Sequence, residues 1–597
     1  MTMTKPTSEQ VTFLQAGSGA TQRTALAKMR DVVSVKDFGA VGDGVTDDTA
    51  AIQLALNASN NIVFPNGSYR ITTQLTKVAD NVNIDFGTAT IINDGPTYTF
   101  VFGTLNDLPQ NKNLLIAGGN FTQSNPSTSS NRNYILIQAI SKFVIDGCTL
   151  QNVSNGGITV YAGAEDGVIQ NVTINGKSNY STIRGIWLNG ATATGWSAQY
   201  VNTSSITRNA TAFPLYAVKN IKISNCSVIL DAYGIYLINS WNCVISNCFV
   251  DISGTGRLRC IALNSYCPQS RVVNCELVSD GSSTGILITQ VSDNVVVANN
   301  VFRGSFGGNR AIYVQYLASA IVNGNRFSDN STQHIQIDTG GFACVKNNEF
   351  VRSSYTASNR AVFVTAIDAA AVNTTQGESA TILENSGVVF TNNFLSKVPI
   401  CALGNTSFLA SNSNKPSFST LIVNDNVMQF MDLCVSTERA CVLESGVGAN
   451  ITNVRCERNI INPYSSGGRS EPLFAGSAFI LESAVAIIAS FQVNNPAAAG
   501  TIVVTKIAGN NISLSASRSG ANLVISPRTN LGSVGSAVPI ALGITDAGGT
   551  TIPHTYIVTP TGSNFTVSAY NSAGASLSFA TLGIKFNILL GPCASGT

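Results

Sequence analysis

A loose internal repeat constrains the fold of this chain more than any other feature of its sequence. Its marker is a polar turn followed by a small or polar residue and a short strand, and it recurs roughly every 22 to 27 residues between about 111 and 360. The copies are DGCTL ending at Leu150, NVTI at Ile174, NCSV at Val228, NCFV at Val250, NCEL at Leu277, NNVF at Phe302, GNRF at Phe327 and NNEF at Phe350. Repeats of this length that hold only short strands and turns are typical of solenoids, so the sequence predicts a parallel β-solenoid and excludes helical repeats.

A second strand in each repeat alternates between two kinds of position. Because successive side chains of a strand point to opposite faces, one row is predicted inside the coil: Ile235, Ile261, Ile286, Ile312, Ile335 and Val362. The row that faces outward is Trp187, Tyr236, Ala262, Leu287, Tyr313, Gln336 and Phe363. Exposed aromatic rings along one side of a solenoid would form a groove for stacking sugar rings. The alternative is that these rings lie beneath loops or against a neighbouring subunit.

The 13 cysteines favour a structural role. They form no CxxC pair, and His334 and His554 are the only histidines, so the sequence predicts no metal site and no cofactor. Four of the cysteines share one repeat position and are expected to stack as small buried residues: Cys148, Cys226, Cys248 and Cys275. The turn asparagines are also expected to be structural, because Asn tolerates left-handed backbone and can stack its amide between coils: Asn225, Asn247, Asn274, Asn299 and Asn325.

Composition narrows the functional classes. Charged residues make up 11% of the chain, well below the usual roughly 25%, and the net charge is +2. The sequence therefore has no basic footprint for nucleic acid, and no apolar run is long enough to cross a membrane. The first residues, MTMTKPTSEQ, lack the apolar core of a signal peptide, so Sec export is not expected.

Residues 33–71 read as a strand, a glycine-rich turn, a short helix and a further strand. Val33, Val35 and Phe38 alternate as a strand, and GAVGDG supplies glycines for a turn with positive φ. Asp48 occupies the expected N-cap of the helix. The apolar face of that helix is Ala51, Ile52, Ala55 and Leu56. The segment IVFPNGSYRI then gives a strand that turns at 65–67 and continues.

This order resembles the first segment of the pectate-lyase-like right-handed β-helix proteins, in particular of bacteriophage tailspikes that degrade capsular or O-antigen polysaccharide. The preceding residues 13–40, FLQAGSGATQRTALAKMRDVVSVKDFGA, are similar to the lead-in of those tailspikes. The resemblance implies an all-β right-handed parallel β-helix with a short N-terminal helical cap, assembled as a homotrimer. It also implies a place on the virion, at the phage tail, with activity outside the cell at the bacterial surface. The N-terminus would then bind other phage tail, baseplate or tailspike proteins.

Four segments are expected along the chain. Residues 1–34 form a virion-attachment or neck peptide, 35–110 the first part of the β-helix with its capping helix, and 111–480 the β-helix that carries the depolymerase site. Residues 481–597 change to short strands between Gly, Asn and Pro turns, which predicts an antiparallel β-sandwich-like domain for trimerisation or carbohydrate binding. The interval from Val172 to Cys226 is about two coils long and holds an irregular stretch, 190–216.

A depolymerase needs two carboxylates for hydrolysis, or a base and a cation for β-elimination. When Cys226, Cys248, Cys275, Asn300 and Arg326 are placed in one register, Asp231 and Asp280 each fall five residues after their marker, two coils apart. Two coil spacings amount to about 9.5 Å, which approaches the carboxylate separation of inverting glycosidases. Asp231 and Asp280 are therefore the leading catalytic pair. Asp251, on the coil between them, and Glu276 are the alternatives.

Substrate binding is predicted for the outward aromatic side of the solenoid. The candidates are Trp187, Tyr236, Arg259, Tyr313 and Trp196, the last of these in the irregular stretch. For a lyase, the groups available as base or charge neutraliser are His334, Tyr233, Arg257, Arg259, Arg310 and Arg360. The sequence thus predicts a tailspike that recognises and depolymerises capsular polysaccharide or O-antigen, with hydrolysis first and a lyase or a non-catalytic receptor-binding fibre as alternatives.

Overall fold

The structure is a computed structural model that describes residues 5–365 with internal gaps and, beyond residue 385, mainly the strands named below. The gaps before 365 are 96, 107, 125–131, 177–182, 191–216, 253–257, 265, 282, 290–291, 307–309, 316–317, 330–332, 339–340 and 353–359. Within these limits the chain is nearly all strand, with two short α-helices and one 3-10 helix. No helix in this part is both long and apolar enough to cross a membrane.

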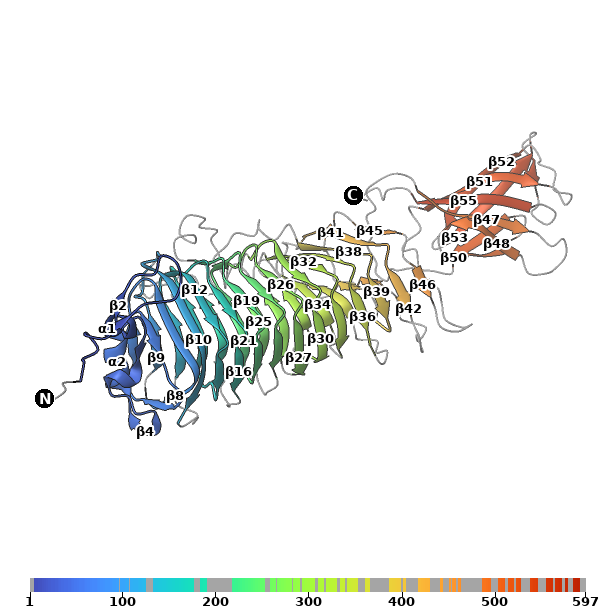
Figure 1. Cartoon of the computed structure of the whole chain (residues 1–597). Helices are drawn as coiled ribbons and strands as arrows, with labels where there is room; N and C mark the ends of the chain where they lie inside the picture. Colours follow the sequence, from blue (N-terminus) through green and yellow to red (C-terminus); the bar gives the residue numbers. More distant parts are fainter. Residues whose placement is uncertain are drawn as a thin grey trace.

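A parallel β-solenoid makes up most of the described chain, and each coil adds one strand to each of three ladders (Figure 1). Ladder 1 consists of β3 (Val33–Ser34), β5 (Asn61–Val63), β8 (Val82–Asn93), β10 (Asn111–Gln123), β12 (Ile140–Asp146), β15 (Val168–Gln170), β19 (Lys222–Ser224), β23 (Val244–Ser246), β26 (Arg271–Val273), β29 (Val295–Ala298), β32 (Ser319–Asn323), β35 (Phe342–Lys346), β38 (Ser386–Thr391), β41 (Ser417–Asn424), β44 (Asn450–Ile451) and β45 (Val454–Glu457). Ladder 2 consists of β4 (Asp43–Asp47), β6 (Ser68–Ile71), the second halves of β8 and β10, β13 (Thr149–Gln151), β16 (Thr173–Gly176), β20 (Ser227–Leu230), β24 (Phe249–Ile252), β27 (Glu276–Asp280), β30 (Val301–Ser305), β33 (Arg326–Asp329), β36 (Glu349–Val351), β39 (Phe394–Ser396), β42 (Val427–Gln429) and β46 (Ile460–Asn462).

Ladder 3 is a separate 13-stranded parallel sheet that closes each coil. Its strands are β7 (Leu75–Lys77), β9 (Tyr98–Phe102), β11 (Asn133–Ile137), β14 (Gly156–Tyr161), β17 (Arg184–Asn189), β21 (Tyr233–Ile238), β25 (Leu258–Asn264), β28 (Ser283–Ile288), β31 (Arg310–Val314), β34 (Gln333–Asp338), β37 (Arg360–Thr365), β40 (Cys401–Leu403) and β43 (Cys441–Leu443). The two-residue strands β18 (Val218–Lys219) and β22 (Ser240–Trp241) pair beside it. The predicted inward row is confirmed, because its members align across neighbouring strands and are buried: Ile235, Ile261, Ile286, Ile312, Ile335 and Val362.

The turn from ladder 1 to ladder 2 has the same two-residue conformation in successive coils. Its first residue is in the left-handed region at Asn225, Asn247, Asn274, Asn299 and Asn347, with φ between 53° and 56°. Its second residue points inward and is buried at Cys226, Cys248, Cys275, Asn300, Asn325, Asn348, Asn393 and Asn426. The structural roles predicted for these cysteines and asparagines are therefore confirmed. The register also corrects one marker, because Val301 pairs with Arg326 and the residue level with Asn300 is Asn325.

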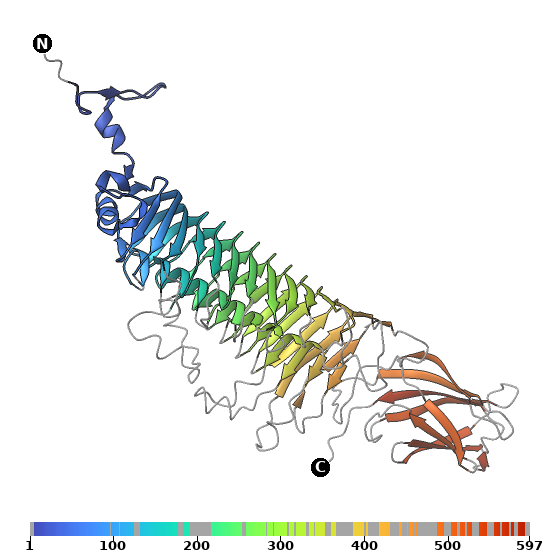
Figure 2. The ribbon, with the colours of Figure 1, turned by 90° about the horizontal axis from the view of Figure 1, so that it is seen from below.

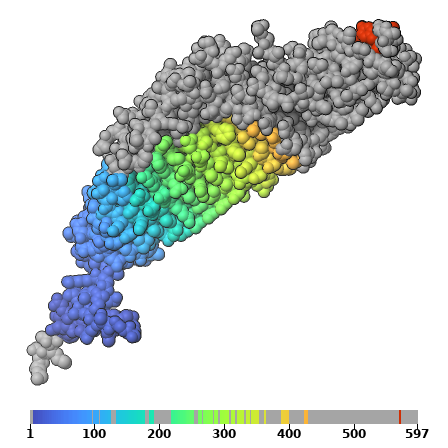
Figure 3. All heavy atoms as spheres, turned by 90° about the horizontal axis from the view of Figure 1, so that it is seen from above, coloured from blue at the N-terminus to red at the C-terminus, as the bar shows by residue number. Residues whose placement is uncertain are grey.

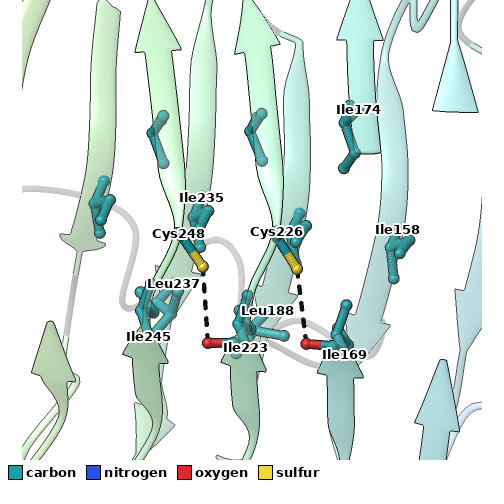
Figure 4. Close-up of a cluster of buried hydrophobic side chains, with 14 of the residues drawn as sticks. Ile158, Ile169, Ile174, Leu188, Ile223, Cys226, Ile235, Leu237, Ile245 and Cys248 are labelled. Carbon is teal, nitrogen blue, oxygen red and sulfur yellow. Dashed lines mark hydrogen bonds between the residues drawn. The ribbon is translucent and has the colours of Figure 1, made fainter. Parts of the chain in front are cut away.

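The residue at this stacked turn position changes from Cys to Asn partway along the solenoid. In the earlier coils the thiols of Cys226 and Cys248 donate to the carbonyl oxygens of Ile169 and Ile223, at 3.8 and 3.9 Å (Figure 4). Burial raises the pKa of the equivalent Cys148 thiol to about 12. From Asn300 onward each side-chain amide donates to the next at 3.0 Å, through Asn325, Asn348, Asn393 and Asn426. The cysteines whose side chains the structure describes are free thiols: Cys148, Cys226, Cys243, Cys248, Cys260, Cys267, Cys275 and Cys344.

The capping segment differs from its sequence interpretation in two details. Only Val33 and Ser34 are strand, and 35–38 form the 3-10 helix η1 (Val35–Phe38), because Ser34 and Asp37 make a reciprocal capping box and Gly39 ends the turn at φ 96°. Helix α2 (Thr49–Ala58) does begin after Asp48, but the Asp48 side chain makes no cap hydrogen bond to it. Its carboxylate instead accepts the backbone N–H groups of Val41 and Gly42 at 2.6 and 3.2 Å.

Asp48 therefore holds the glycine-rich turn closed over the first coil, and its removal has a predictable effect. Asp48 is 1% exposed, and Asp48→Ala removes the buried acceptor of two partly buried backbone N–H groups. We expect it to lower the free energy of unfolding by roughly 2 to 4 kcal/mol, measured by chemical denaturation. Asp43→Asn is the matched control, because that carboxylate lies on the surface of the same turn. Equal stability of the two variants would contradict this role for Asp48.

The two ends of the chain lie outside the coil stack. At the N-terminus, β1 (Thr12–Phe13) pairs with β2 (Arg23–Thr24), and α1 (Ala25–Met29) follows without a single buried residue. These elements project from the end of the solenoid (Figures 2 and 3). The C-terminal strands are antiparallel, as predicted. One sheet has the order β48 (Val503–Gly509), β47 (Ala486–Asn494), β55 (Gly583–Leu590) and β51 (Ala537–Thr545). The other consists of β49 (Leu514–Ser519), β50 (Asn522–Pro527), β53 (Asn564–Asn571), β52 (His554–Thr561) and β54 (Ser576–Leu577).

The interval between Val172 and Cys226 is one coil, although its length suggested about two. Strand β16 pairs directly with β20, and Thr173 lies opposite Ser227. The additional residues follow β17 as an insertion, which includes 191–216 and lies outside the described residues. Trp196, one of the predicted binding residues, falls within it.

Candidate functional site

The outward face of ladder 3 carries two parallel rows of side chains, and their register fixes which residues are neighbours. One row runs near the start of each strand and aligns Arg184, Tyr233, Arg259 and Thr284. The second row aligns Trp187, Tyr236, Ala262, Leu287, Tyr313, Gln336 and Phe363, as the alternation predicted. Because adjacent strands lie about 4.8 Å apart, neighbours in a row come from successive coils.

A cluster of aromatic rings surrounds Arg184 on this face. The Arg184 guanidinium carbon lies 4.3 Å from the ring centre of Trp187 and 4.9 Å from that of Tyr236. Tyr161 packs edge-on against Trp187 at 6.0 Å, and Tyr233 packs edge-on against Tyr236 at 5.0 Å. Five side chains from three successive strands thus form one half-buried cation–aromatic cluster.

Hydrogen bonds orient the hydroxyl groups of this cluster. Arg259 Nη1 donates to the Tyr233 hydroxyl at 3.1 Å, and Asn264 Nδ2 donates to the Tyr236 hydroxyl at 2.8 Å. Burial raises the pKa of Tyr236, so its hydroxyl stays protonated at neutral pH. Trp187, Tyr236 and Arg259, three of the residues predicted from sequence, are therefore brought together.

The candidate carboxylates border this cluster on the side of ladder 2. Leu230 pairs with Ile252 and Ile252 pairs with Ser279, so Asp231 and Asp280 each follow an equivalent position two coils apart. Asp231 is half-buried in the turn that leads to Tyr233, and Asp280 is exposed at the end of β27. The separation of their backbones is about two coil spacings, roughly 9.6 Å.

The other two candidate carboxylates lie farther back on ladder 2. Asp251 is half-buried in β24, opposite Ile229 on one side and Val278 on the other. Glu276 Oε1 lies 3.2 Å from Arg303 Nε in a partly exposed ion pair. An ion pair of this kind contributes little stability, and it occupies the Glu276 carboxylate with a cation from the next coil.

The outward row is more covered than its sequence suggested. Ala262, Leu287 and Gln336 point away from the core, yet they are only 0%, 3% and 5% exposed. Trp187, Tyr236 and Tyr313 are half-buried. Tyr313 lies three coils beyond Tyr236, with the Arg310 guanidinium carbon 3.9 Å from the centre of its ring. The binding residues therefore form two separate groups on this face and not one continuous exposed stripe.

His334 is not a surface residue of this face. It is fully buried inside the coil, with its ring centre 5.6 Å from Phe327 and 5.5 Å from Phe350. The reason is that its strand position faces inward, where other coils place Gly234, Cys260, Gly285 and Ala311. Among the described residues no group of three His, Cys, Asp or Glu side chains is placed to hold a metal ion.

Sequence reasoning missed Arg184, Tyr161 and Asn264. The structure places all three in the Trp187 and Tyr236 cluster. From the sequence, Asn264 could be placed only on the outward face of its strand, two residues after Ala262. Arg184 had a stronger signal, because it shares its strand position with Arg259, which was proposed.

Two models of known protein families match the part of the chain that forms the solenoid. A family model described as rhamnogalacturonase A/epimerase, pectate lyase-like, matches residues 32–258, and a right-handed β-helix model matches residues 184–386. The solenoid thus resembles pectate-lyase-like right-handed β-helix proteins over these residues. Its hand, which was expected from the resemblance of the capping segment, is thereby supported along most of the described coils.

Relatives of this β-helix occur in phages and in polysaccharide-modifying enzymes. The pre-neck appendage protein of Bacillus phage B103 is 28% identical over 285 residues, which is 46% of this chain and 26% of that protein. Mannuronan C5-epimerase AlgE1 of Azotobacter vinelandii is 52% identical over 44 residues, or 6% of this chain and 3% of the enzyme. The chain thus spans about a quarter or less of these two relatives. The solved tailspike gp61 of Pseudomonas phage phi297 is 10% identical with a TM-score of 0.46, covering 94% of this chain and 99% of that one.

Proposed function

We propose that this protein is a phage tailspike that binds and depolymerises a bacterial surface polysaccharide, capsule or O-antigen. The observation that carries the proposal is the half-buried cluster of Arg184, Trp187, Tyr233 and Tyr236 on the outer face of the β-helix, bordered by Asp231. Flat aromatic faces and fixed hydrogen-bond donors are the groups that position sugar rings. The phage relative and the capping segment support the assignment to a virion.

Glycoside hydrolysis by Asp231 and Asp280 is the proposed chemistry. One carboxyl group would protonate the leaving oxygen while the other, on the far side of the bond, activates a water molecule. A backbone separation of roughly 9.6 Å leaves room for that water and approaches the carboxyl separation of inverting enzymes. Asp251, which lies on the intervening coil, is the alternative partner.

A β-elimination mechanism is the second candidate, and one contact favours it. The Tyr233 hydroxyl accepts a hydrogen bond from Arg259, which pairs a potential base with a cation that could neutralise a uronate carboxylate. His334 cannot serve as the base of such a lyase, because it is buried inside the coil.

Product analysis tests the proposal and separates the two mechanisms. The purified chain is incubated with capsular and O-antigen polysaccharides of the phage host, and the oligosaccharides released are examined by mass spectrometry. Hydrolysis adds one water to each cleaved bond, whereas elimination adds none and leaves an unsaturated, ultraviolet-absorbing sugar. Binding without any release of oligosaccharide would instead favour a non-catalytic receptor-binding fibre.

Trp187→Ala tests the aromatic cluster directly. Loss of the indole removes one stacking surface and the ring beneath Arg184, and we expect polysaccharide affinity to fall by about 10-fold or more, as for other desolvated cation–aromatic contacts. Binding is measured by surface plasmon resonance at low temperature. Trp241→Ala is the control, because that ring packs against Tyr266 away from the cluster. A similar loss in both variants would contradict the specific role of Trp187.

The remaining segments receive roles from the same proposal. Residues 1–34 would attach the protein to other phage tail, baseplate or tailspike proteins, and the 481–597 segment would support a homotrimer or bind glycan. The N-terminal elements expose Phe13, Leu14, Met29 and Val32 to 39%, 61%, 72% and 47%, respectively, which suits a surface that other chains cover. Light scattering of the intact chain and of a chain lacking the first 34 residues tests both roles. A monomeric intact chain would contradict the trimer.

A further inference from the structure

Arginines recur on every second coil of ladder 3, in a single register. The pairs Arg184–Tyr233, Tyr233–Arg259 and Arg259–Thr284 align one strand position, and the next strands continue it to Arg310. Successive arginines are therefore separated by two coil spacings, roughly 9.6 Å. The same position continues through Gln333 to Arg360, again two coils later.

Two of these arginines have an Nε–H group without an acceptor. In the part of the chain that the structure describes, the Nε atoms of Arg259 and Arg310 are buried and have no hydrogen-bond partner. Arg259 makes one named hydrogen bond, to Tyr233, and Arg310 makes only its stacking contact with Tyr313. Because a guanidinium carries five N–H donors, both side chains present unused donors on a half-buried face.

Among the side chains that the structure describes, no acidic group forms an ion pair with these two arginines. The neighbouring acidic residues by register belong to ladder 2 and the turns that follow it: Asp231, Asp251, Asp280 and, one coil beyond Arg310, Asp329. A partly desolvated cation without an acidic partner is costly, and an anion supplied from outside would relieve that cost.

We propose that the bound polysaccharide is acidic, carries a negative charge on every second sugar, and lies along the solenoid axis with its charges on Arg184, Arg259 and Arg310. This inference rests on the proposed function and names the substrate class of the same site. An extended pyranose chain advances by close to one coil spacing per sugar, so charges on alternate sugars match guanidinium groups on alternate coils. Tyr233 and Tyr236, on the coil between the first two arginines, would face the uncharged sugar.

The charge pattern explains why these positions are arginine. A planar guanidinium can donate two parallel hydrogen bonds to a carboxylate and still stack on an aromatic ring, as Arg184 and Arg310 do here. Lysine in the same place would keep the charge and lose both the bidentate geometry and the stacking. A neutral glycan would offer only hydroxyl acceptors, which compensate a buried cation less well.

Binding measurements with a charge-matched panel test the inference. The full-length protein is tested by surface plasmon resonance at low temperature against acidic capsular polysaccharides with one carboxylate per disaccharide, the same polymers after carboxyl reduction, and neutral capsular polysaccharides. We expect at least one acidic polymer to bind, its reduced form to bind at least 10-fold more weakly, and affinity to fall as salt is raised. Arg259→Gln and Arg310→Gln should each weaken binding of that polymer by roughly 10- to 100-fold.

Controls separate loss of charge recognition from loss of structure. Arg310→Lys should recover part of the affinity, whereas Arg326→Gln, whose ion pair with Glu349 lies on ladder 2, should bind like the wild type. Binding of no acidic polymer, equal binding of the reduced form, or unchanged binding by the Arg259 and Arg310 variants would each overturn the inference. Cleavage of a neutral polysaccharide would overturn it while leaving the proposed function in place. Absence of any binding or cleavage across the panel would refute both.

Discussion

Asp231→Asn and Asp280→Asn are each expected to slow polysaccharide cleavage by about 10²- to 10⁴-fold, because each variant removes one of the two carboxyl groups that move protons during hydrolysis. Asparagine keeps the size of the side chain, so binding of the polysaccharide should change little. The rate is measured as reducing ends released per unit time, and binding is measured on the same polymer at low temperature.

The stereochemistry of the product checks the same pair independently. Two carboxylates about two coils apart leave room for a water molecule, so the new anomeric centre should have inverted configuration by proton NMR. Asp85→Asn, on the exposed part of β8, is the control for a general effect of removing surface charge. Wild-type rates in both Asp231 and Asp280 variants would exclude this pair, and a large loss in Asp251→Asn alone would move the chemistry to the intervening coil.

The solenoid could be predicted from sequence because its two strongest signals are local and repeated. The alternation around Ile235 and Ile261 survives in every coil, since a shift of one residue would turn the core row outward. The stacked Cys226 and Cys248 were recognisable for a similar reason. Only small or self-pairing side chains fit at an inward turn position that repeats every coil.

Other parts of the fold depend on contacts that a local pattern does not contain. Asp48 looked like a helix cap, yet its oxygens pair with the backbone of Val41 and Gly42, which the turn brings back over it. The strand expected through Val35 and Phe38 became a 3-10 helix because Ser34 and Asp37 satisfy each other across three residues. The insertion after β17 doubled the apparent length of one coil, since periodicity alone cannot tell an insertion from a second coil.

The candidate site was only partly predictable, for a geometric reason. Register could place Asp231, Asp280 and the outward row, because these follow from counting within the repeat. It could not give burial, so the sequence left open whether Leu287 and Gln336 lie on an open face or are covered, and the structure shows that they are covered. It also could not reveal that Arg184 lies over the ring of Trp187, since that contact depends on side-chain direction between rows.

Asn348→Ala is expected to lower stability through the amide ladder, in which Asn348 is a central member. Its Oδ1 accepts from the backbone N–H and from Nδ2 of Asn325, at 2.8 and 3.0 Å, and its own Nδ2 donates to Val322, Lys346 and Asn393. Asn348 is 2% exposed, so water cannot easily replace these partners. The buried backbone N–H of Asn325 would lose its acceptor, whereas Asn325 Nδ2 would keep Val297 and Asn323. The free energy of unfolding should therefore fall by roughly 1 to 3 kcal/mol.

Asn347→Gly provides the matched control on the neighbouring residue. Asn347 has φ 56°, a conformation that glycine adopts freely, and its side chain makes one exposed hydrogen bond, to Asn323. That variant should remain within about 1 kcal/mol of the wild type. Because neighbouring coils support one another, the damage from Asn348→Ala should spread along the ladder and appear as faster hydrogen exchange at Asn325 and Asn393. Similar unfolding midpoints for the two variants in denaturant would show that packing of the surrounding coil, and not the amide ladder, holds these turns together.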